Sequence, residues 1–233
     1  MSGALRQFTA HQRDTGLLSL PWEAFYLADD LALSDGDPVP QWDDLSGNGR
    51  HLSRAVTSQQ PTFRAASAAL NSQPAVVFDG SDDSLASPMF TTAQPTEMAA
   101  AMVIPTATNK VFVDNRSGGV TVRQFFGSNA GNSNLRLYAS STSITGTVVG
   151  GGVRHYWRAR FDGASSFLRR DEVEVITGDP GAGSTDGLTL GADAGLARQS
   201  AIAVGFFGLL GRQLTVQEAA DLAGWVQDKY DTP

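Results

Sequence analysis

Two segments, read together, indicate the architecture of this chain: Gln41-Trp42-Asp43-Asp44-Leu45-Ser46-Gly47-Asn48-Gly49 and Pro74-Ala75-Val76-Val77-Phe78-Asp79-Gly80-Ser81-Asp82-Asp83-Ser84-Leu85. The first predicts a tight loop behind an apolar anchor, Trp42, because Gly and Asn adopt positive φ at little steric cost. The second predicts a short buried strand over residues 75–78, then a turn at Asp79-Gly80 and a returning strand from Ser84, as in a hairpin. The unit therefore says more about fold than about chemistry.

The same two segments carry a family resemblance. Trp-x-Asp-x-Ser-Gly-Asn-Gly at 42–49 and Pro-Ala-Val-x-Phe-Asp-Gly-Ser-Asp-Asp-x-Leu at 74–85 resemble the laminin-G-like, concanavalin A-like jelly-roll domains. Such domains are common in bacterial surface proteins and in minor tail proteins of bacteriophages. Arg160-Phe161-Asp162-Gly163 resembles a hairpin of that family, whereas residues 168–172 depart from its pattern. The resemblance covers roughly residues 25–230 and implies a fold rather than an activity, since one fold hosts many functions.

The composition favours a folded domain with few cofactor options. The chain has 233 residues, of which 41% are hydrophobic, which is enough for a core. Its formal net charge of −7 argues against binding nucleic acid or an anionic membrane surface, although a local basic patch around Arg154, Arg158 and Arg160 stays open. It has no cysteine, which excludes disulfides, thiolate catalysis and cysteine-ligated metals.

The N-terminal segment differs from the rest. Residues 1–20 are polar and mixed in charge, and we expect them to form an arm that docks the following domain, residues 21–233, onto a larger assembly. A tail that merely packs on the domain is the alternative. We expect no secretory signal in residues 1–11 and no membrane span, since no apolar run approaches the roughly 20 residues required.

Alternating hydrophobicity predicts many short strands. Leu135, Leu137 and Ala139 alternate with Arg136 and Tyr138, the pattern of a half-buried strand. Other strands are predicted over residues 24–28, 97–104, 110–114, 124–126, 156–161 and 201–206. In 156–161 the pattern predicts one apolar and one cationic face, and in 201–206 it puts residues 202, 204 and 206 on one face. With no long linker, we expect an all-β, two-sheet antiparallel jelly-roll sandwich of the concanavalin A-like kind.

One short helix is predicted at the C-terminus. Thr215 and Glu218 have the spacing of a capping box, and Leu222, Val226 and Tyr230 follow with helical spacing. Four tryptophans are expected in the core because their neighbours are apolar: Trp22, Trp42, Trp157 and Trp225.

Catalytic motifs are weak. Glucanases of the resembling fold use a Glu-x-Asp-x-Glu strand motif with two carboxylates about 5 Å apart. Asp171-Glu172-Val173-Glu174 approaches it, with Glu172 and Glu174 on one face if this is a strand, but the Asp lies outside the pair. We interpret the segment as a solvated hairpin face. No Gly-x-Ser-x-Gly elbow or Walker loop occurs. We expect no enzymatic activity, with a glycoside hydrolase as the alternative.

One acidic cluster is a candidate metal site. Asp79, Asp82 and Asp83 offer hard oxygen ligands of the kind calcium prefers, and a second acidic segment spans residues 29–37. No EF-hand spacing occurs. In the resembling family the first cluster mostly forms a hairpin turn. We therefore expect no cofactor and keep calcium at Asp79, Asp82 and Asp83 as a hypothesis.

Sugar binding on such sandwiches uses exposed aromatic rings with polar side chains around them. Five residues could present such a surface: Asn134, Arg136, Tyr138, Tyr156 and Arg158. A solvated outer face without a ligand is the alternative.

The sequence thus predicts a non-enzymatic virion protein. We expect a bacteriophage minor tail protein whose lectin-like domain contacts host-envelope polysaccharide, repeated as a homo-oligomer within the assembly. Its N-terminal arm would bind other virion proteins, and nucleic acid and membrane are not expected partners. A purely structural capsid or tail decoration, or a place on the bacterial cell surface, is the alternative.

Overall fold

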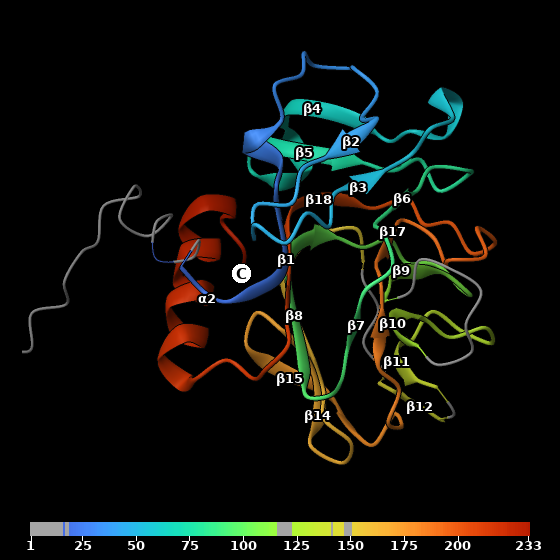
Figure 1. Ribbon diagram of the computed structural model, residues 1–233, viewed down its shortest axis with the longest axis vertical. Helices are drawn as coiled ribbons and strands as arrows, with labels where there is room; N and C mark the ends of the chain where they lie inside the picture. The colour runs from blue at the N-terminus through green and yellow to red at the C-terminus, as the bar shows by residue number, and fades with distance from the viewer. Residues whose placement is uncertain (1–15, 17–18, 116–122, 141, 147–150) are drawn as a thin grey trace, which may run out of the picture.

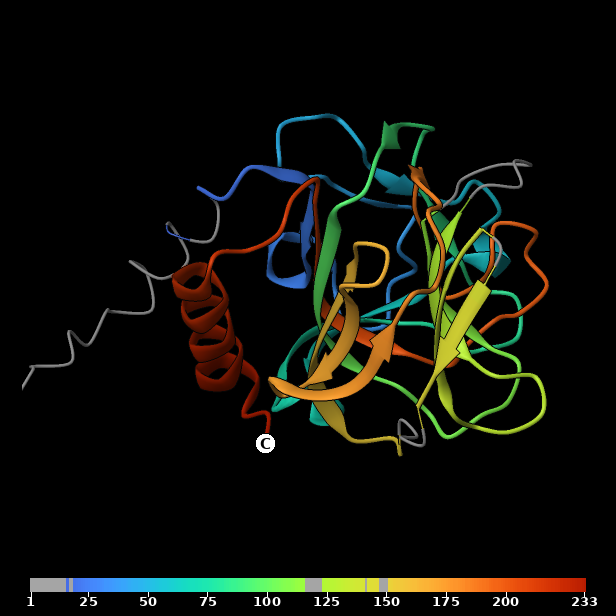
Figure 2. The same ribbon diagram turned by 90° about the horizontal axis from the view of Figure 1, so that it is seen from below.

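The chain folds into two packed antiparallel sheets with one long helix on the outside (Figure 1). The structure, a computed structural model, describes residues 16, 19–115, 123–140, 142–146 and 151–233. The helix α2 (Val216–Tyr230) covers the outer face of one sheet. The second sheet packs against the opposite face of that sheet (Figure 2). This confirms the predicted all-β sandwich with a C-terminal helix. The predicted arm, residues 1–20, lies outside the described residues apart from Gly16, Ser19 and Leu20.

The sheet under the helix, sheet A, contains the longest strands. Its order is β15 (Val173–Gly178), β14 (Ser166–Arg170), β13 (Arg154–Phe161), β8 (Thr96–Val103), β18 (Ala203–Leu210), β5 (Gln73–Val77) and β4 (Thr62–Ser67). A further strand, β1 (Trp22–Leu27), pairs with the second half of β18, while β5 pairs with its first half.

The other sheet, sheet B, is built from shorter strands. Its order is β12 (Thr142–Thr145), β11 (Leu135–Ala139), β10 (Gln124–Ser128), β9 (Val111–Asp114), β17 (Thr189–Leu190), β6 (Leu85–Ala86), β3 (Leu52–Ser53) and β2 (Gln41–Trp42). A separate two-stranded pair joins β7 (Thr91–Thr92) to β16 (Thr185–Asp186).

Two hydrophobic clusters hold these layers together. The larger one fills the space between the sheets and includes Trp42 and Trp157. The second lies between sheet A and α2 and includes Trp22 and Trp225, so the expected burial of all four tryptophans is confirmed. Sheet A is therefore covered on both faces, which explains why β18 is buried at every residue. Neither cluster includes the outer face of sheet B, where the side chains of β11 alternate between buried and partly exposed.

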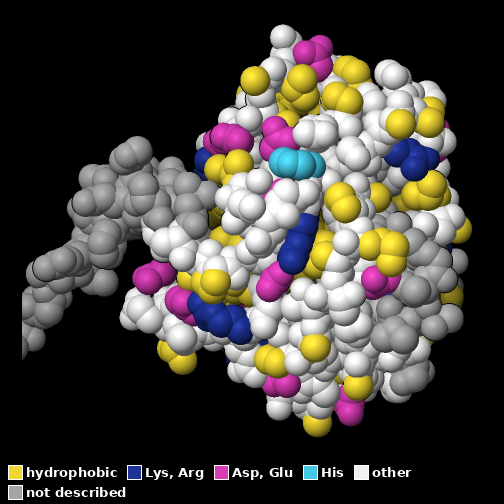
Figure 3. Space-filling model, viewed as in Figure 1, with side chains coloured by type: hydrophobic (Ala, Val, Ile, Leu, Met, Phe, Trp, Pro, Cys, Tyr) yellow, Lys and Arg dark blue, Asp and Glu magenta, His cyan; other side chains and the backbone are white. Residues whose placement is uncertain are grey.

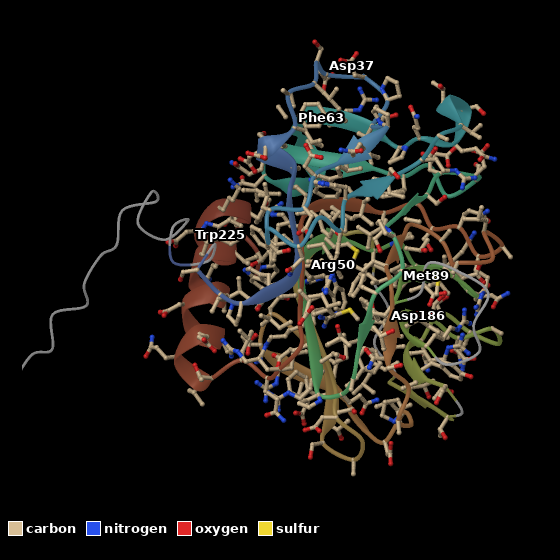
Figure 4. The ribbon with its side chains drawn as sticks, in the orientation of Figure 1. Asp37, Arg50, Phe63, Met89, Asp186 and Trp225 are labelled. Atoms are coloured by element: carbon tan, nitrogen blue, oxygen red, sulfur yellow. The ribbon has the colours of Figure 1, made fainter. Side chains whose placement is uncertain are left out.

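The packing of α2 follows from its sequence. Thr215 accepts a hydrogen bond from the Glu218 backbone N–H, and the Glu218 carboxylate accepts from the Thr215 N–H, so the predicted capping box is confirmed. From the helix, Trp225 lies against sheet A, where its ring meets Phe206 edge-on at 5.2 Å (Figure 4).

The alternation predicted for residues 202–206 is wrong at its end. Val204 faces the core between the sheets, but Phe206 faces α2. The cause is a register shift between Val204 and Phe206, where β18 bulges against β8. A bulge inserts one extra residue, so every side chain after it changes face.

The loop in the first quoted segment is hydrogen-bonded to β1. The Asp44 carboxylate accepts hydrogen bonds from the backbone N–H groups of Phe25, Ser46 and Arg50. Asn48 donates its amide to the Trp22 and Glu23 carbonyls. These polar residues therefore satisfy backbone groups of β1 and of the loop itself, which is a structural role.

The second quoted segment is not a hairpin, contrary to the prediction. Its strand β5 lies in sheet A and the returning strand β6 lies in sheet B, so the turn carries the chain from one layer to the other. Gly80 has a φ of 79°, and a Cβ there would lie 2.7 Å from the Ala201 nitrogen. The turn thus requires glycine on both counts.

Within the part of the chain that the structure describes, no helix has the length and apolar character needed to cross a bilayer.

Candidate functional site

The outer face of sheet B carries a stacked aromatic pair, of which one ring is partly exposed. Phe125 on β10 lies directly opposite Tyr138 on β11. Their rings stack, with centroids 5.0 Å apart and an interplanar angle of 24°. Phe125 is buried beneath its neighbours, while Tyr138 stays partly exposed and donates its hydroxyl to the Ser140 carbonyl. The arrangement is a ring held in a fixed orientation on the surface of the sheet.

Three arginines surround this pair. The guanidinium carbons of Arg123, Arg136 and Arg198 lie 4.8, 4.6 and 5.2 Å from the centre of the Phe125 ring. Each distance is within the range of a cation–π contact. We call the surface formed by Arg123, Phe125, Arg136, Tyr138 and Arg198 the arginine face.

Two of the arginines are paired with acids. Arg123 contacts the buried Asp114 carboxylate at 2.9 Å, and Arg198 contacts Asp193 at 2.8 Å. Burial would raise the pKa of Asp193, but the Ala197 N–H and the Arg198 guanidinium outweigh it and hold that pKa below its usual range. Asp193 is therefore ionised near neutral pH and supports Arg198.

Arg136 is different. Among the described residues no carboxylate forms an ion pair with it, and its Nε is buried without a hydrogen-bond partner. Burial lowers the pKa of Arg136, and the like charges of Arg198 and Arg123 lower it further. The guanidinium stays charged at any physiological pH, so the effect is a local excess of positive potential.

Three of the five predicted sugar-binding residues belong to this region. Arg136 and Tyr138 are part of the arginine face. Asn134 is partly exposed and directly precedes β11, at the same two-residue spacing that puts Arg136 and Tyr138 on one face of the strand. Across from them on β12, Thr145 pairs with Arg136 and Ser143 with Tyr138, and both are exposed. The surface thus combines an aromatic ring, charged forks and hydroxyl groups.

The other two predicted residues do not lie on any exposed surface, so that part of the prediction is wrong. Tyr156 is only 2% exposed and is packed in the cluster between sheet A and α2. Arg158, also 2% exposed, contacts Glu97 at 2.6 Å and a second acid, Glu172. The cationic face of β13 is real, but the helix and acidic side chains cover it.

The acidic hairpin is part of the same ion-pair network. Glu172 lies in the turn between β14 and β15, with a φ of 62°, and not in a strand beside Glu174. It pairs with Arg158 and Arg169, while Glu174 contacts Arg169 at 3.7 Å. Glu172 and Glu174 therefore do not share a strand face, the segment belongs to a hairpin as interpreted from the sequence, and both carboxylates are held by arginines.

The candidate metal ligands come together as the sequence suggested. One oxygen atom from each of Asp79, Asp82 and Asp83 lies within 4.8 Å of the others. Two of these carboxylates already accept hydrogen bonds from the backbone of the turn. Asp79 accepts from the Ser81 and Asp82 N–H groups, and Asp83 accepts from the Asp79 N–H. Burial raises the pKa of Asp83 to about 6, and the Asp79 and Asp82 charges act in the same direction against the Asp79 N–H. The cluster fits both a turn and a cation.

Another arginine–aromatic contact lies near the middle of the molecule. Arg50 lies over the Phe90 ring at 3.8 Å and forms an ion pair with Glu23 (Figure 4). On the face drawn in Figure 3, the Lys and Arg side chains stand apart from one another, and acidic side chains lie beside several of them. That face therefore offers no continuous basic surface.

Sequence reasoning missed Phe125, Arg123 and Arg198 as parts of the face. Phe125 follows from the β10–β11 pairing once the register is known, since it lies opposite Tyr138. Arg198 lies in the loop after β17, 62 residues from Arg136, and no local pattern connects the two. The missing information was long-range strand pairing.

The comparisons show relatives in fold. No family model and no curated protein matches the chain. Among solved structures, Trypanosoma rangeli sialidase matches 95% of this chain at a TM-score of 0.61 and 10% identity, and the chain spans 38% of its length. Domain 4 of AbnA, an extracellular GH43 arabinanase from Geobacillus stearothermophilus solved with arabinotriose, matches 84% of this chain and is covered over 100% of its own length, with a TM-score of 0.56 and 13% identity.

A third neighbour is the binding domain of Paraclostridial Mosquitocidal Protein 1. It matches 84% of this chain at a TM-score of 0.57 and 12% identity, and the chain spans 52% of it. At these identities the likeness shows the β-sandwich fold. Two of the three neighbours are, by name, carbohydrate-active proteins or parts of them.

Proposed function

We propose that this chain is a non-enzymatic carbohydrate-binding module and that the arginine face is its binding surface. The observation that carries the proposal is the Tyr138 ring, which is partly exposed and stacked on Phe125, together with the three guanidinium groups around the Phe125 ring. A fixed aromatic ring offers a flat apolar surface to the C–H face of a sugar at little entropic cost. Guanidinium groups donate several hydrogen bonds in a planar fork to sugar oxygens.

The fold neighbours support this assignment. Domain 4 of AbnA was solved with arabinotriose, and the sialidase is named for its action on a sugar. The AbnA domain is matched over its whole length, so the comparison is with a whole module. The network of Glu97, Glu172 and Arg158 favours a structural over a catalytic use of the buried acids.

We place the module in a virion, as a minor tail protein that contacts host-envelope polysaccharide. The support is the resemblance of residues 42–49 and 74–85 to the jelly-roll domains of such proteins. In this reading residues 1–20 dock on other virion proteins, and the module is repeated with the symmetry of the particle.

The test is retention of the purified chain in native gels that contain soluble polysaccharides, together with pull-down on cell-wall fractions. Tyr138→Ala should weaken binding about tenfold, because an aromatic contact is worth about 1.5 kcal/mol. The matched control is Arg64→Ala, since Arg64 is a half-exposed arginine on β4 in sheet A, paired with Asp35. Retention of no glycan, or equal binding by the Tyr138 variant, would refute the proposal and favour a purely structural decoration.

A further inference from the structure

The arginine face has more positive charge than its own acids balance. Asp114 and Asp193 pair with Arg123 and Arg198, and Arg136 is left without a carboxylate partner among the described residues. Arg54 and Arg170 also form no ion pair among the described residues, but Arg136 is in addition held beside two other arginines. The imbalance lies on the surface that the proposed function assigns to the ligand.

The geometry keeps these charges close together. Three guanidinium groups lie within 5.2 Å of the centre of one phenyl ring, so they also lie near one another. Each gains a cation–π contact, but like charges held together repel. The lowered pKa of Arg136, caused by burial and by the two neighbouring arginines, is the expected sign of that repulsion. An anion at Arg136 would relieve it.

Among the described residues, the fold does not compensate the Arg136 guanidinium with hydrogen bonds either. Its Nε is buried and has no partner within the described part of the chain, so an anion would meet the terminal N–H groups of the guanidinium. Guanidinium groups bind carboxylate and phosphate oxygens through two parallel N–H donors, a geometry that a neutral hydroxyl does not match. The exposed hydroxyls of Ser143 and Thr145 on the neighbouring strand, and the Tyr138 ring, are suited to the uncharged part of the same ligand.

We infer that the arginine face binds an acidic glycan, with Arg136 donating hydrogen bonds to the anionic group of the sugar and Tyr138 stacking on its ring. This rests on the proposed function and narrows it to glycans that carry carboxylate or phosphate groups. The shared chemistry is an oxyanion attached to a sugar or sugar-like chain. A uronic acid polymer and a phosphate-linked wall polymer both supply it.

The experiment compares matched polymers by isothermal titration calorimetry with the full chain. Polygalacturonate and its methyl ester have the same backbone with and without charge, and poly(glycerol phosphate) provides the phosphate. We expect at least about tenfold tighter binding of one anionic polymer than of the ester, as one charge-assisted pair provides. Affinity for it should fall as salt rises. The polymer that binds decides between carboxylate and phosphate.

The variants decide whether Arg136 is responsible. Arg136→Gln should weaken binding of the anionic polymer more than binding of the ester and so remove the preference between them, while Arg136→Lys should keep part of that preference. Arg64→Ala, on the other sheet, should behave as the wild type. A preference that survives Arg136→Gln, or equal affinity for ester and acid, would overturn the inference while leaving glycan binding intact. Binding of no polymer, neutral or charged, would instead refute the proposed function along with it.

Discussion

The ring of Tyr230 lies directly on Gly205. A Cβ atom built at Gly205 would come within 2.4 Å of Tyr230 Cε1, where there is no room for it. Gly205 is at the bulge of β18, and Tyr230 ends α2, so this contact sets how closely the end of the helix approaches sheet A. The missing side chain is what allows the two to touch.

Gly205→Ala should therefore destabilise the protein by about 1–3 kcal/mol, the usual range for overpacking a core. Urea unfolding followed by tryptophan fluorescence measures it. The matched control is Gly224→Ala in the middle of α2, where a Cβ meets nothing within 4 Å. That variant should gain up to about 1 kcal/mol from helix propensity. Equal effects of the two substitutions would contradict the close contact.

Tyr156 carries a buried hydroxyl with no hydrogen-bond partner within the described residues. Burial raises the pKa of this phenol well above its ordinary value. Removing an unpaired polar group from a core recovers its desolvation cost, about 1 kcal/mol or more. Tyr156→Phe should thus leave the free energy of unfolding unchanged or raise it, and should not alter glycan binding. A loss above about 1 kcal/mol in urea titrations would mean that the hydroxyl is bonded after all, to water for example.

Glu97 is the buried acid of the ion-pair network. Its side chain is fully buried and accepts hydrogen bonds from Arg158, Arg160 and the Leu214 backbone N–H. Glu97→Gln removes the charge while keeping the shape and should destabilise the fold by about 3 kcal/mol or more, because it leaves buried arginine charge less compensated. The control is Glu174→Gln, a 46% exposed carboxylate in a loose pair with Arg169, which should change stability by about 1 kcal/mol at most. Similar losses in thermal and urea unfolding would argue against a buried network.

Asp83 predicts a pH dependence with a defined sign. Its pKa in the folded chain is about 6, above the ordinary value of 3.8, so the folded state binds a proton more tightly than the unfolded state. The stabilisation of the folded state by this tighter proton binding is fully present below pH 3.8 and is lost as the pH rises through 6. Asp83→Asn should consequently be more stable than the wild type at pH 7.5, and this advantage should disappear at pH 4. Melting temperatures of both proteins at several pH values test it.

Calcium is the matching test for the hypothesis of a metal at Asp79, Asp82 and Asp83. We expect no change of melting temperature with calcium at pH 7.5, because the carboxylates already accept hydrogen bonds from the backbone of their turn. A calcium-dependent rise in the wild type that is absent in Asp83→Asn would establish the metal site instead.

The sequence predicted β11 well and β13 poorly, for the same physical reason. Alternation reports that a strand has two different faces, and in β11 the polar face is indeed partly exposed. In β13 the polar face is equally clear, but Glu97 and the helix α2, both distant in sequence, cover it. Whether a polar face meets water depends on elements that the local pattern does not contain.

The sequence predicted where turns occur but not which sheet the following strand joins. Gly80 indicates a turn with positive φ, yet nothing in residues 79–86 tells whether the next strand stays in the same sheet. The bulge in β18 is invisible for a similar reason, since Gly205 marks a place where a strand can bulge without requiring it.

Because α2 covers sheet A, it also determines which side of the molecule faces a surface to which the chain is tethered. Leu20 packs into the cluster beneath the helix, and residues 231–233 follow the helix end, so both ends of the described core emerge on that side. The arginine face lies on the opposite side of the sandwich. A molecule tethered at either end, to a carrier or to a sensor surface, would present its arginines outward. Covalent attachment through the C-terminus is accordingly the orientation in which ligand access should be least obstructed.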